Sequence, residues 1–561
     1  MTGRNPRMEG TTVDMEKQKD HERGRSPSEK STSPNSSSSD QNSIFEPIRA
    51  ASNRRASRET TRTGSLRREL SNNGYGCDDL IDDAENPSSE APEPMPEKDP
   101  YEVTWDGELD PCNPRNMPKW KKWTIIGITS FGSFCVTNAS AVYTATYAQM
   151  NEEFGSSRLV ATIGLSTFVL GIALGPFWSP LAEFYGRRPI YLAAFTVFMI
   201  FLIPSAVAQN IQTMIVVRFF QGLAGSAFLS VSGGTVGDLF ARDEMQAPMA
   251  IFTTAPFLGP STGPLIGGLT NSFVSWRWTH YIILIESVVV IASLYFLVPE
   301  TYHPVLLAQK ARKLRKETKD DGYFAPLDKT SRSVLTALKH ALLRPLQILF
   351  FEPMCLILDI YSAMLLGLLY LFFGAFPLIF STNHGFNLWQ VGLSFMGLLI
   401  SIPLAALTSP IWVRVRNRLA EKRGREEPED QLPMVIVAAP LITGGLFWFG
   451  FTTYPSIHWI VPIVGSGVYG IGMMLAFTGI FTFLVDAYPR YAASALAGNA
   501  LVRCSFGAAF PLFGIQMYEK LGYQWATGLL AFLTLAMLPF PYLFFKYGER
   551  IRAKSRFATS S

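Results

Sequence analysis

The stretch AEFYGRRPIY, residues 182–191, interrupts a long apolar sequence with one carboxylate, Glu183, and two adjacent arginines, Arg187 and Arg188. Gly186 comes directly before the arginines and a proline follows them, which is typical of a turn between two elements. The apolar segments on either side are about 20 residues long, the length that a helix needs to cross the hydrocarbon core of a bilayer. The stretch therefore predicts a polar loop between two membrane-spanning helices.

The composition beyond this loop is that of a membrane protein with a polar tail. Of the 561 residues, 48% are hydrophobic and only 17% are charged, although residues 1–100 are rich in Ser, Pro, Asn, Arg and Glu. That N-terminal segment holds too little apolar surface to form a core, and we predict that it is disordered. Within it, Ser57 and Ser65 lie close to arginines, as basic-directed kinases prefer. Kinases are therefore candidate partners of the tail, and chance pairs of arginine and serine in a solvated segment are the alternative.

Twelve apolar segments after the tail are long enough to span a bilayer. Because lipid offers the backbone no hydrogen-bonding partners and the segments lack the alternating pattern of barrel strands, we predict helices. The predicted spans are residues 123–147, 160–182, 189–208, 212–236, 248–270, 279–298, 352–380, 389–412, 434–453, 457–485, 492–517 and 524–546. Six precede a polar insert and six follow it, which predicts an all-α membrane protein built from two related six-helix halves.

The distribution of basic residues predicts which ends of the spans face the cytoplasm. If both termini are cytoplasmic, the inner connections carry most of the basic residues, and the outer connections carry only Arg158, Arg277 and Lys520. This asymmetry agrees with the positive-inside rule. We therefore predict a cytoplasmic tail at 1–100, an N-terminal half at 101–300, a cytoplasmic central loop at 301–348, a C-terminal half at 349–548 and a cytoplasmic tail at 549–561.

The position of the 182–191 loop between the second and third spans points to a family resemblance. The loop is similar to the signature G-x-x-x-D-R-x-G-R-R of the major facilitator superfamily, whose last three positions it matches with Gly186, Arg187 and Arg188. It departs from the signature at Ser179, Glu183 and Phe184, which stand where the family has Gly, Asp and a basic residue. The resemblance implies the major facilitator fold, with twelve transmembrane helices in two six-helix halves, and transport by alternating access.

The charges of this loop can act as a conformational latch between neighbouring helices. The arginines can bind a carboxylate or helix carbonyls across the gap, and Asp238 at the end of the fourth span is the expected partner. Such a latch would favour one of the two conformations that alternating access requires. A plain positively charged anchor at the membrane surface is the alternative. The latch residues that we predict are Glu183, Gly186, Arg187, Arg188 and Asp238.

The fourth span carries an arginine within apolar sequence. The run RFFQGLAGSA places Arg218, Gln221, Gly222 and Gly225 on one helix face. A guanidinium is costly to bury and needs an acceptor or a watery cavity, so we expect a functional role, with snorkelling toward an interface as the alternative. The run also resembles the R-x-x-Q-G motif of the superfamily, which implies a role for Arg218 in proton coupling.

The fifth span, which contains APFLGPSTGPLIGG, is rich in glycine and proline. Small residues recur every four positions and let another helix approach closely, and the prolines remove internal hydrogen bonds and would bend the helix. The segment resembles the antiporter motif of the superfamily, which implies an exporter that exchanges its cargo for protons. A tightly packed, kinked helix with no bearing on the direction of transport is the alternative. The motif residues are Gly259, Pro260, Gly263, Pro264, Gly267 and Gly268.

Three further stretches narrow the resemblance to the fungal twelve-span drug:proton antiporters, which include multidrug and polyamine exporters. They are DPCNPRNMPKWKKW before the first span, PETYHPVLLAQKARKLRKET after the sixth, and VDAYPRYAASALAGNALVRCSFGAAFPLFGIQMYEKLGYQWA across the tenth to twelfth. The resemblance covers residues 100–550. The acidic residue that many bacterial relatives carry in the first span is missing here, so we expect the proton to bind elsewhere.

Polar and ionisable residues within the predicted spans are candidates for proton coupling and cargo binding. A carboxylate at lipid depth suits a residue that binds and releases a proton, and Asp359 and Glu286 are the candidates. A fixed partnership with an arginine is the alternative for either. Asn499 and Arg503 lie one turn apart on the eleventh span, where they contact cargo or pack helices. The predicted cavity residues are Asn138, Gln221, Tyr361, Asn499 and Arg503.

Together these features predict a proton-coupled efflux transporter of the plasma membrane that exports hydrophobic small molecules, such as drugs, fungicides or secondary metabolites. Its expected partners are the cargo, protons and membrane lipid, without nucleic acid, cofactor or metal. Export of polyamines is the alternative within the same family, although a cationic cargo would call for more acidic residues than the sequence offers. An enzyme is not predicted, because the six histidines are dispersed and the five cysteines show no paired spacing.

Overall fold

The computed structural model describes residues 100–107, 110–241, 244–329, 333–553, 555, 557 and 558. The predicted disordered tail before residue 100, with Ser57 and Ser65, lies outside the described residues. In the part of the chain that is described, the regular structure is helical apart from one isolated bridge between Glu102 and Phe324.

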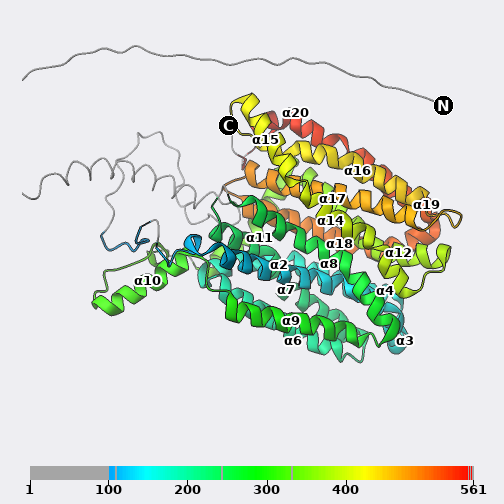
Figure 1. The fold of residues 1–561 in the computed structure, drawn as a ribbon, viewed down its shortest axis with the longest axis horizontal. Helices are drawn as coiled ribbons and strands as arrows, with labels where there is room; N and C mark the ends of the chain where they lie inside the picture. The colour runs from blue at the N-terminus through cyan, green and yellow to red at the C-terminus, as the bar shows by residue number, and fades with distance from the viewer. Residues whose placement is uncertain are drawn as a thin grey trace, which may run out of the picture. The chain divides into compact units, whose positions relative to one another are not determined.

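The predicted N-terminal half is a helical bundle in which two spans are interrupted (Figure 1). The first span passes through a 3-10 turn, η2 (Tyr143–Thr146), and the second breaks at η3 (Gly175–Phe177), where a proline has no N–H to continue the helix. The helices are α2 (Lys119–Val142), α3 (Tyr147–Phe154), α4 (Arg158–Ala173), α5 (Trp178–Tyr185), α6 (Arg187–Ala206), α7 (Ile211–Leu239), α8 (Gln246–Phe273) and α9 (Arg277–Leu297).

The predicted C-terminal half has the same character. Pro410 and Pro539 stand in the first turns of α15 and α20, where a missing N–H costs nothing, and each marks a break in a span. The helices are α12 (Pro353–His384), α13 (Leu388–Ser394), α14 (Met396–Leu407), α15 (Ser409–Arg423), α16 (Leu432–Phe451), α17 (Ile460–Ala487), α18 (Ala492–Leu521), α19 (Tyr523–Met537) and α20 (Pro539–Arg552).

The insert between the halves contains two helices, α10 (His303–Thr318) and α11 (Val334–Phe351). Twelve described segments are long and apolar enough to cross a membrane, and the chain is a multi-pass membrane protein. All but one of these segments are predicted spans, and the exception is α11, which we predicted to be part of a loop. Conversely α8, the fifth predicted span, is not among them, because glycine, proline and hydroxyl residues lower its hydropathy. It nevertheless packs along α2 within the bundle (Figure 1).

The two halves meet along a small set of helices. α4 packs against α18, and α8 packs against α13 and α14. Ser166 of α4 donates a hydrogen bond of 2.7 Å to the carbonyl oxygen of Ala508 in α18, so the contact includes a polar link. The cavity described below lies at this junction.

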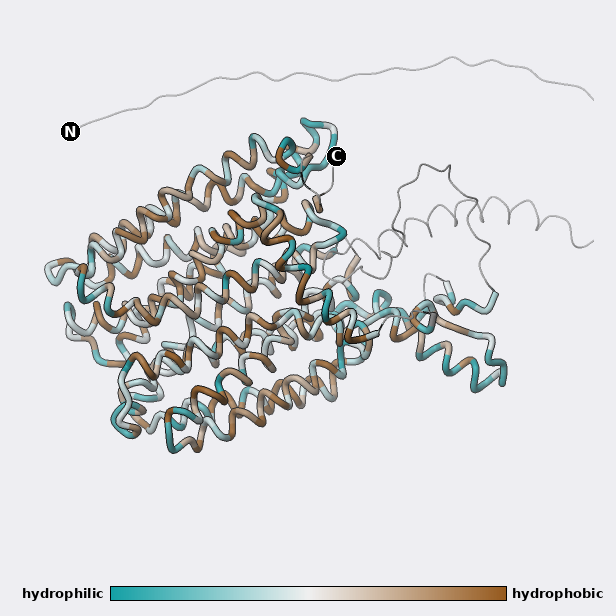
Figure 2. Tube along the Cα trace, turned by 180° about the vertical axis from the view of Figure 1, so that it is seen from behind, coloured by the Kyte–Doolittle hydropathy of each residue, from teal (hydrophilic) through white to brown (hydrophobic). Residues whose placement is uncertain are grey.

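One end of the bundle carries both described ends of the chain, together with α10 and α15, and we call this end the terminal face (Figure 1). There Ser555 donates a hydrogen bond of 2.7 Å to Glu352, which directly precedes α12. Hydrophilic residues gather at the ends of the bundle and along α10, whereas the middle of the spans is mostly hydrophobic (Figure 2). This is the distribution expected of a bundle whose middle lies in lipid. We call the opposite end the far face.

The segment before the first span is fastened to α10. Val103 packs in a small apolar cluster with alanines of α10, and Lys310 forms ion pairs of 2.8 Å with Asp106 and 3.1 Å with Asp110. The hydrogen bond from the Asp106 backbone N–H, supported by Lys310, outweighs burial and lowers the pKa of Asp110 to about 2. The Asp110 carboxylate therefore stays ionised across the physiological pH range, and its ion pair with Lys310 persists.

Candidate functional site

A cavity of about 200 Å³ lies between the two halves. It extends toward the terminal face, since Ser179, Ala341 and Ser494, which come from α5, α11 and the start of α18, are among its lining residues. Most of the lining is apolar, and hydroxyl groups, one amide and one guanidinium supply its polar side chains. A concave and mainly apolar site with a few polar groups is the usual form of a small-molecule site.

Asn499 links the cavity to a buried carboxylate. This residue lines the cavity, and its amide nitrogen donates hydrogen bonds to Asp359 at 2.9 Å and to Ser362 at 2.6 Å on α12. Asp359 is fully buried and also accepts a contact of 3.4 Å from the thiol of Cys355. Asp359 thus lies one side chain behind the cavity wall, and Asn499 connects it to the cavity.

Arg503 lines the cavity one turn after Asn499. Its guanidinium lies 5.6 Å from the ring centre of Phe477 and 5.1 Å from that of Phe481, so cation–π interactions with α17 hold it in place. Within the described residues it forms no ion pair, and its Nε atom has no hydrogen-bond partner. The guanidinium therefore keeps hydrogen-bonding capacity for a cargo.

Arg218 of α7 is buried, with 1% of its surface exposed, and does not line the cavity. Its guanidinium donates hydrogen bonds of 2.8 Å to the carbonyl of Ala139 and 3.2 Å to that of Ser140, where α2 passes into η2. The N–H of Tyr143 is turned to a different carbonyl at this point, so α2 leaves an acceptor open. The rings of Tyr143 and Phe168 each lie 4.3 Å from the guanidinium. Arg218 therefore joins α7 to the break in the first span.

Three residues predicted to line the cavity lie elsewhere in this structure. Gln221 turns toward α6, where it donates a hydrogen bond of 2.6 Å to Ser205. Tyr361 is buried within the C-terminal half. Asn138 of α2 is buried and donates a long hydrogen bond of 3.4 Å to Glu286 of α9. The sequence places a residue along a helix, but helix packing decides which side it faces, and these three face neighbours within their own half.

A direct polar contact joins the halves beside the cavity. The hydroxyl oxygens of Ser140 and Tyr370 lie 2.9 Å apart, across α2 and α12. Phe257 of α8 stacks on Phe477 of α17, with ring centres 4.7 Å apart. Neither pairing was predicted, because an aromatic or hydroxyl residue in an apolar span carries no signal for a partner in the other half.

The glycine ladder of α8 packs directly on the first span. A Cβ atom at Gly263 would lie 2.6 Å from that of Ala141, and one at Gly267 would lie 2.8 Å from that of Ala145. Gly259 faces α2 in the same way. Despite its three internal prolines, α8 stays helical over its whole length. The spacing thus corresponds to a close helix contact within the N-terminal half.

The next glycine of α8 faces the C-terminal half. A Cβ atom at Gly268 would lie 2.8 Å from the carbonyl oxygen of Leu388, and one at Gly392 of α13 would lie 2.6 Å from the carbonyl oxygen of Pro264. The two helices therefore touch through their backbones, with almost no side chain between them. This backbone contact joins the two halves on the far-face side of the cavity.

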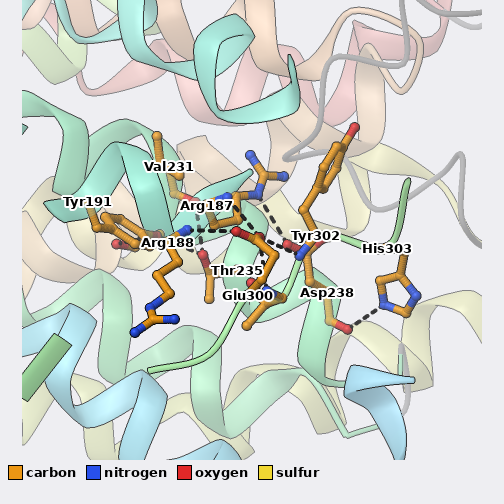
Figure 3. Close-up of polar contacts among 11 residues, drawn as sticks. Arg187, Arg188, Tyr191, Val231, Thr235, Asp238, Glu300, Tyr302 and His303 are labelled. Atoms are coloured by element: carbon orange, nitrogen blue, oxygen red, sulfur yellow. Dashed lines mark hydrogen bonds and ion pairs between the residues drawn. The ribbon is translucent and has the colours of Figure 1, made fainter. Parts of the chain in front are cut away.

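The 182–191 loop lies in a polar cluster at the terminal face (Figure 3). Arg187 Nε lies 3.1 Å from the Asp238 carboxylate, and the two side chains are 3% and 12% exposed. The Arg187 guanidinium also lies 4.6 Å from the ring centre of Tyr302. The buried ion pair joins the start of α6 to the end of α7, the pairing that the sequence suggested for the loop arginines and Asp238.

Glu300, which follows α9, belongs to this cluster and was not predicted. Its carboxylate accepts hydrogen bonds of 2.8 and 3.1 Å from the backbone N–H groups of Arg187 and Arg188 (Figure 3). It thereby caps the N-terminus of α6, where unpaired N–H groups favour a negative charge. Gly186 has a φ of 100°, and a Cβ atom there would overlap the Glu300 carboxylate. The PETYHP stretch contains this glutamate, but only the three-dimensional return of the chain shows its partner.

The other charged groups of the cluster have separate neighbours. Arg188 donates a hydrogen bond of 2.7 Å to the carbonyl of Tyr295 rather than to Asp238. His303 Nε2 lies 2.8 Å from the Asp238 carbonyl oxygen, and burial lowers the pKa of His303, so the ring is neutral at physiological pH. The Glu183 carboxylate interacts electrostatically with the buried guanidinium of Arg187. The cluster thus joins α5, α6, α7 and the segment after α9.

Comparisons with known proteins give a consistent result. The sequence profile of the Major Facilitator Superfamily matches residues 129–511. Efflux pump atB of Aspergillus terreus is 49% identical over 463 residues, which cover 81% of this chain and 90% of that protein. Probable drug/proton antiporter YHK8 of Saccharomyces cerevisiae is 40% identical over 467 residues, which cover 82% and 91%. Among solved structures, the proton:xylose symporter XylE has a TM-score of 0.56 at 16% identity, covering 77% of this chain and 96% of that one, which is a likeness of fold.

Proposed function

The chain belongs to the major facilitator superfamily, and on this premise we propose that it is a proton-coupled efflux transporter that exports hydrophobic small molecules, such as drugs or secondary metabolites, by alternating access. The observation that carries the proposal is the cavity between the halves, which extends toward the terminal face while a backbone contact joins the halves on the far-face side. A transporter that works by alternating access has such a conformation when it takes up cargo. The two relatives, an efflux pump and a probable drug/proton antiporter, support efflux as the direction.

We place the terminal face in the cytoplasm and the protein in the plasma membrane. The concentration of basic residues in the connections on that side supports the orientation. The domain organisation predicted from the sequence, with both tails and the central insert in the cytoplasm, is retained in this proposal. A cavity that extends toward the cytoplasm is the state in which an exporter collects its cargo.

For proton coupling we propose Asp359 as the carrier, with Glu286 as the second candidate. Asp359 is fully buried and is bound to Asn499, which lines the cavity. Protonation would remove the charge that the Asn499 amide binds, so proton and cargo can influence each other through one side chain. Glu286 is bound to Asn138, away from the cavity. Arg218, which binds two carbonyls where α2 passes into η2, is proposed to transmit the effect of this protonation.

The polar cluster at the terminal face is proposed to be a latch. Its members Glu183, Gly186, Arg187, Arg188 and Asp238 were predicted, and Glu300 joins them in the structure. A charge cluster that joins four parts of the N-terminal half must rearrange if those helices tilt apart, so it biases the protein toward one state. The antiporter motif of α8, from Gly259 to Gly268, is proposed to keep α8 close to α2 while the far face opens.

Polyamine export is not favoured. A polyamine is a multiple cation and would need carboxylates in the cavity. Among the described residues that line the cavity, Arg503 is the only one with a formal charge, and this charge is positive. The cavity would therefore repel a polyamine.

Efflux is tested with Nile red, a neutral fluorescent dye, in yeast cells that lack their own exporters. Cells that express the full chain are expected to retain several-fold less dye than cells with an empty vector, and a protonophore should abolish the difference. Equal retention would reject efflux as the function. A difference that survives the protonophore would reject the proton as the driving ion while leaving efflux in place.

Asp359→Asn is expected to abolish uphill transport driven by a proton gradient and to leave downhill exchange of cargo largely intact. The asparagine keeps the shape and the hydrogen bond to Asn499 but cannot bind and release a proton. Transport of Nile red into or out of proteoliposomes, with and without a pH gradient, measures both activities. Glu286→Gln is the matched control. If Glu286→Gln loses uphill transport and Asp359→Asn does not, the carrier is Glu286.

A further inference from the structure

We propose that the cavity binds organic anions, namely apolar molecules that carry a carboxylate, and that Arg503 binds their charge. This inference rests on the proposed function of the cavity as the cargo site and goes beyond it by naming the class of cargo. Arg503 has the only formal charge among the described lining residues. In a mainly apolar cavity a single charge has a large effect on which molecules bind, because the surroundings screen it weakly.

The Arg503 guanidinium is the main group of the cavity that can donate hydrogen bonds to a cargo. Several lining hydroxyls already donate to carbonyl oxygens of their own helices, and such a hydroxyl offers only its lone pairs to a cargo. These hydroxyls belong to Thr137, Ser226, Ser230 and Thr253. The Arg503 guanidinium therefore supplies most of the spare donors. A carboxylate fits it, since it can accept two parallel N–H···O bonds from one guanidinium.

No carboxylate of the described residues occupies this guanidinium. Asp359 interacts with Arg503 through space, but its oxygen accepts the Asn499 amide at 2.9 Å instead. Arg187 shows the contrast, because its charge is matched by Asp238 at 3.1 Å. Arg187 is thus an arginine with a partner inside the fold, whereas the Arg503 guanidinium lies beside the rings of Phe477 and Phe481 and forms no ion pair among the described residues.

A second cavity repeats the pattern on the far-face side. It has a volume of about 250 Å³ and is lined by η2, α3, α4 and α8 of one half and by α12, α13 and the following Phe395 of the other. Arg158 has the only formal charge among its described lining residues. The Tyr147 hydroxyl, which also lines it, is buried and has no hydrogen-bond partner in the described part of the chain. An anion would therefore meet a guanidinium in both cavities, and no carboxylate of the described lining would repel it.

The test compares three probes of similar size: 2-naphthoate, the neutral 2-naphthamide and the cationic 2-naphthylmethylammonium. Binding to the purified full-length protein in lipid nanodiscs is measured by calorimetry at pH 7.4. We expect naphthoate to bind about tenfold or more tightly than the amide, because a charge-assisted hydrogen bond is stronger than a neutral one. The cation should bind more weakly than the amide.

Arg503→Gln is expected to weaken naphthoate binding about tenfold or more and to change amide binding less than about twofold. Arg503→Lys should retain part of the naphthoate affinity, which keeps the test informative if the glutamine variant does not fold. Arg418→Gln is the matched control, since Arg418 is exposed on α15 and does not line the cavity. This variant should bind all three probes as the unaltered protein does.

Two results would overturn the inference. One is equal or weaker binding of naphthoate than of the amide to the unaltered protein, and the other is unchanged naphthoate affinity in Arg503→Gln. Either result leaves the efflux proposal standing if Nile red is still exported. Conversely, absence of Nile red efflux together with Arg503-dependent naphthoate binding would reject efflux and uphold the anion site.

Discussion

Arg187→Ala is expected to lower the free energy of unfolding by about 3–5 kcal/mol, because the substitution leaves the largely buried Asp238 carboxylate without its counter-charge. The two groups lie 3.1 Å apart, and the change also removes the contact of Arg187 with the Tyr302 ring. The measurement is denaturant unfolding of the purified protein in detergent. Transport in proteoliposomes, below the unfolding temperature, should fall as well, because the latch no longer favours one conformation.

Arg188→Ala is the matched control for this prediction. Arg188 is the adjacent arginine, so a plain positive anchor would use both residues alike, but its side chain binds the Tyr295 carbonyl and lies 5.9 Å from the Tyr295 ring centre, without an ion pair to Asp238. We expect a loss of about 1 kcal/mol for Arg188→Ala. Equal losses of stability, transport and membrane insertion in the two variants would favour the anchor. In the double variant Arg187→Met, Asp238→Leu most of the stability should return, because no buried charge remains unpaired.

Arg218→Leu is expected to abolish proton-driven transport and to destabilise the N-terminal half. The substitution leaves the carbonyls of Ala139 and Ser140 without their donor at the break in α2, and an unpaired buried polar group costs about 1–3 kcal/mol. The interactions of the guanidinium with Tyr143 and Phe168 are lost as well. Unfolding in detergent and gradient-driven transport of Nile red measure the two effects.

Arg218→Lys separates a structural role from a role in coupling. A lysine ammonium can reach a carbonyl and keeps the positive charge, but it lacks the planar fork that binds two carbonyls at once. If Arg218→Lys recovers both stability and proton-driven transport, the arginine only braces the helix break. If stability recovers and the response to the pH gradient does not, Arg218 takes part in coupling. Full transport by Arg218→Leu would contradict both roles.

The fold could be predicted from the sequence because the length and hydropathy of a span are local properties. The exceptions are instructive. The residues of α8 are too small and too polar to give a strongly apolar segment, yet close packing on α2 places this helix inside the bundle. In α11, Lys339, His340 and Arg344 are scattered among leucines, so the helix resembles a polar insert although it is long and apolar enough to span. Hydropathy alone therefore misses a helix such as α8, whose place in the bundle depends on packing.

The candidate site was predictable only in part, because rotation of a helix about its axis is fixed by packing. The sequence identified Asn499 and Arg503, which line the cavity, with the same reasoning that selected Gln221 and Asn138, which do not. The role of Glu300 depends on the return of the chain after α9 to the start of α6, which no local pattern encodes. Polar residues within apolar spans thus indicate that a site exists, whereas their grouping requires coordinates.

The backbone contact between Gly268 and Gly392 has a consequence for the speed of the transport cycle. Two helices that touch through glycines cover little apolar side-chain surface, so parting them exposes little of it and costs little free energy. This contact therefore depends on the close fit of the two backbones rather than on buried apolar side chains. A larger residue at either glycine is expected to keep the two helices apart, and cargo would then move down its gradient without proton exchange.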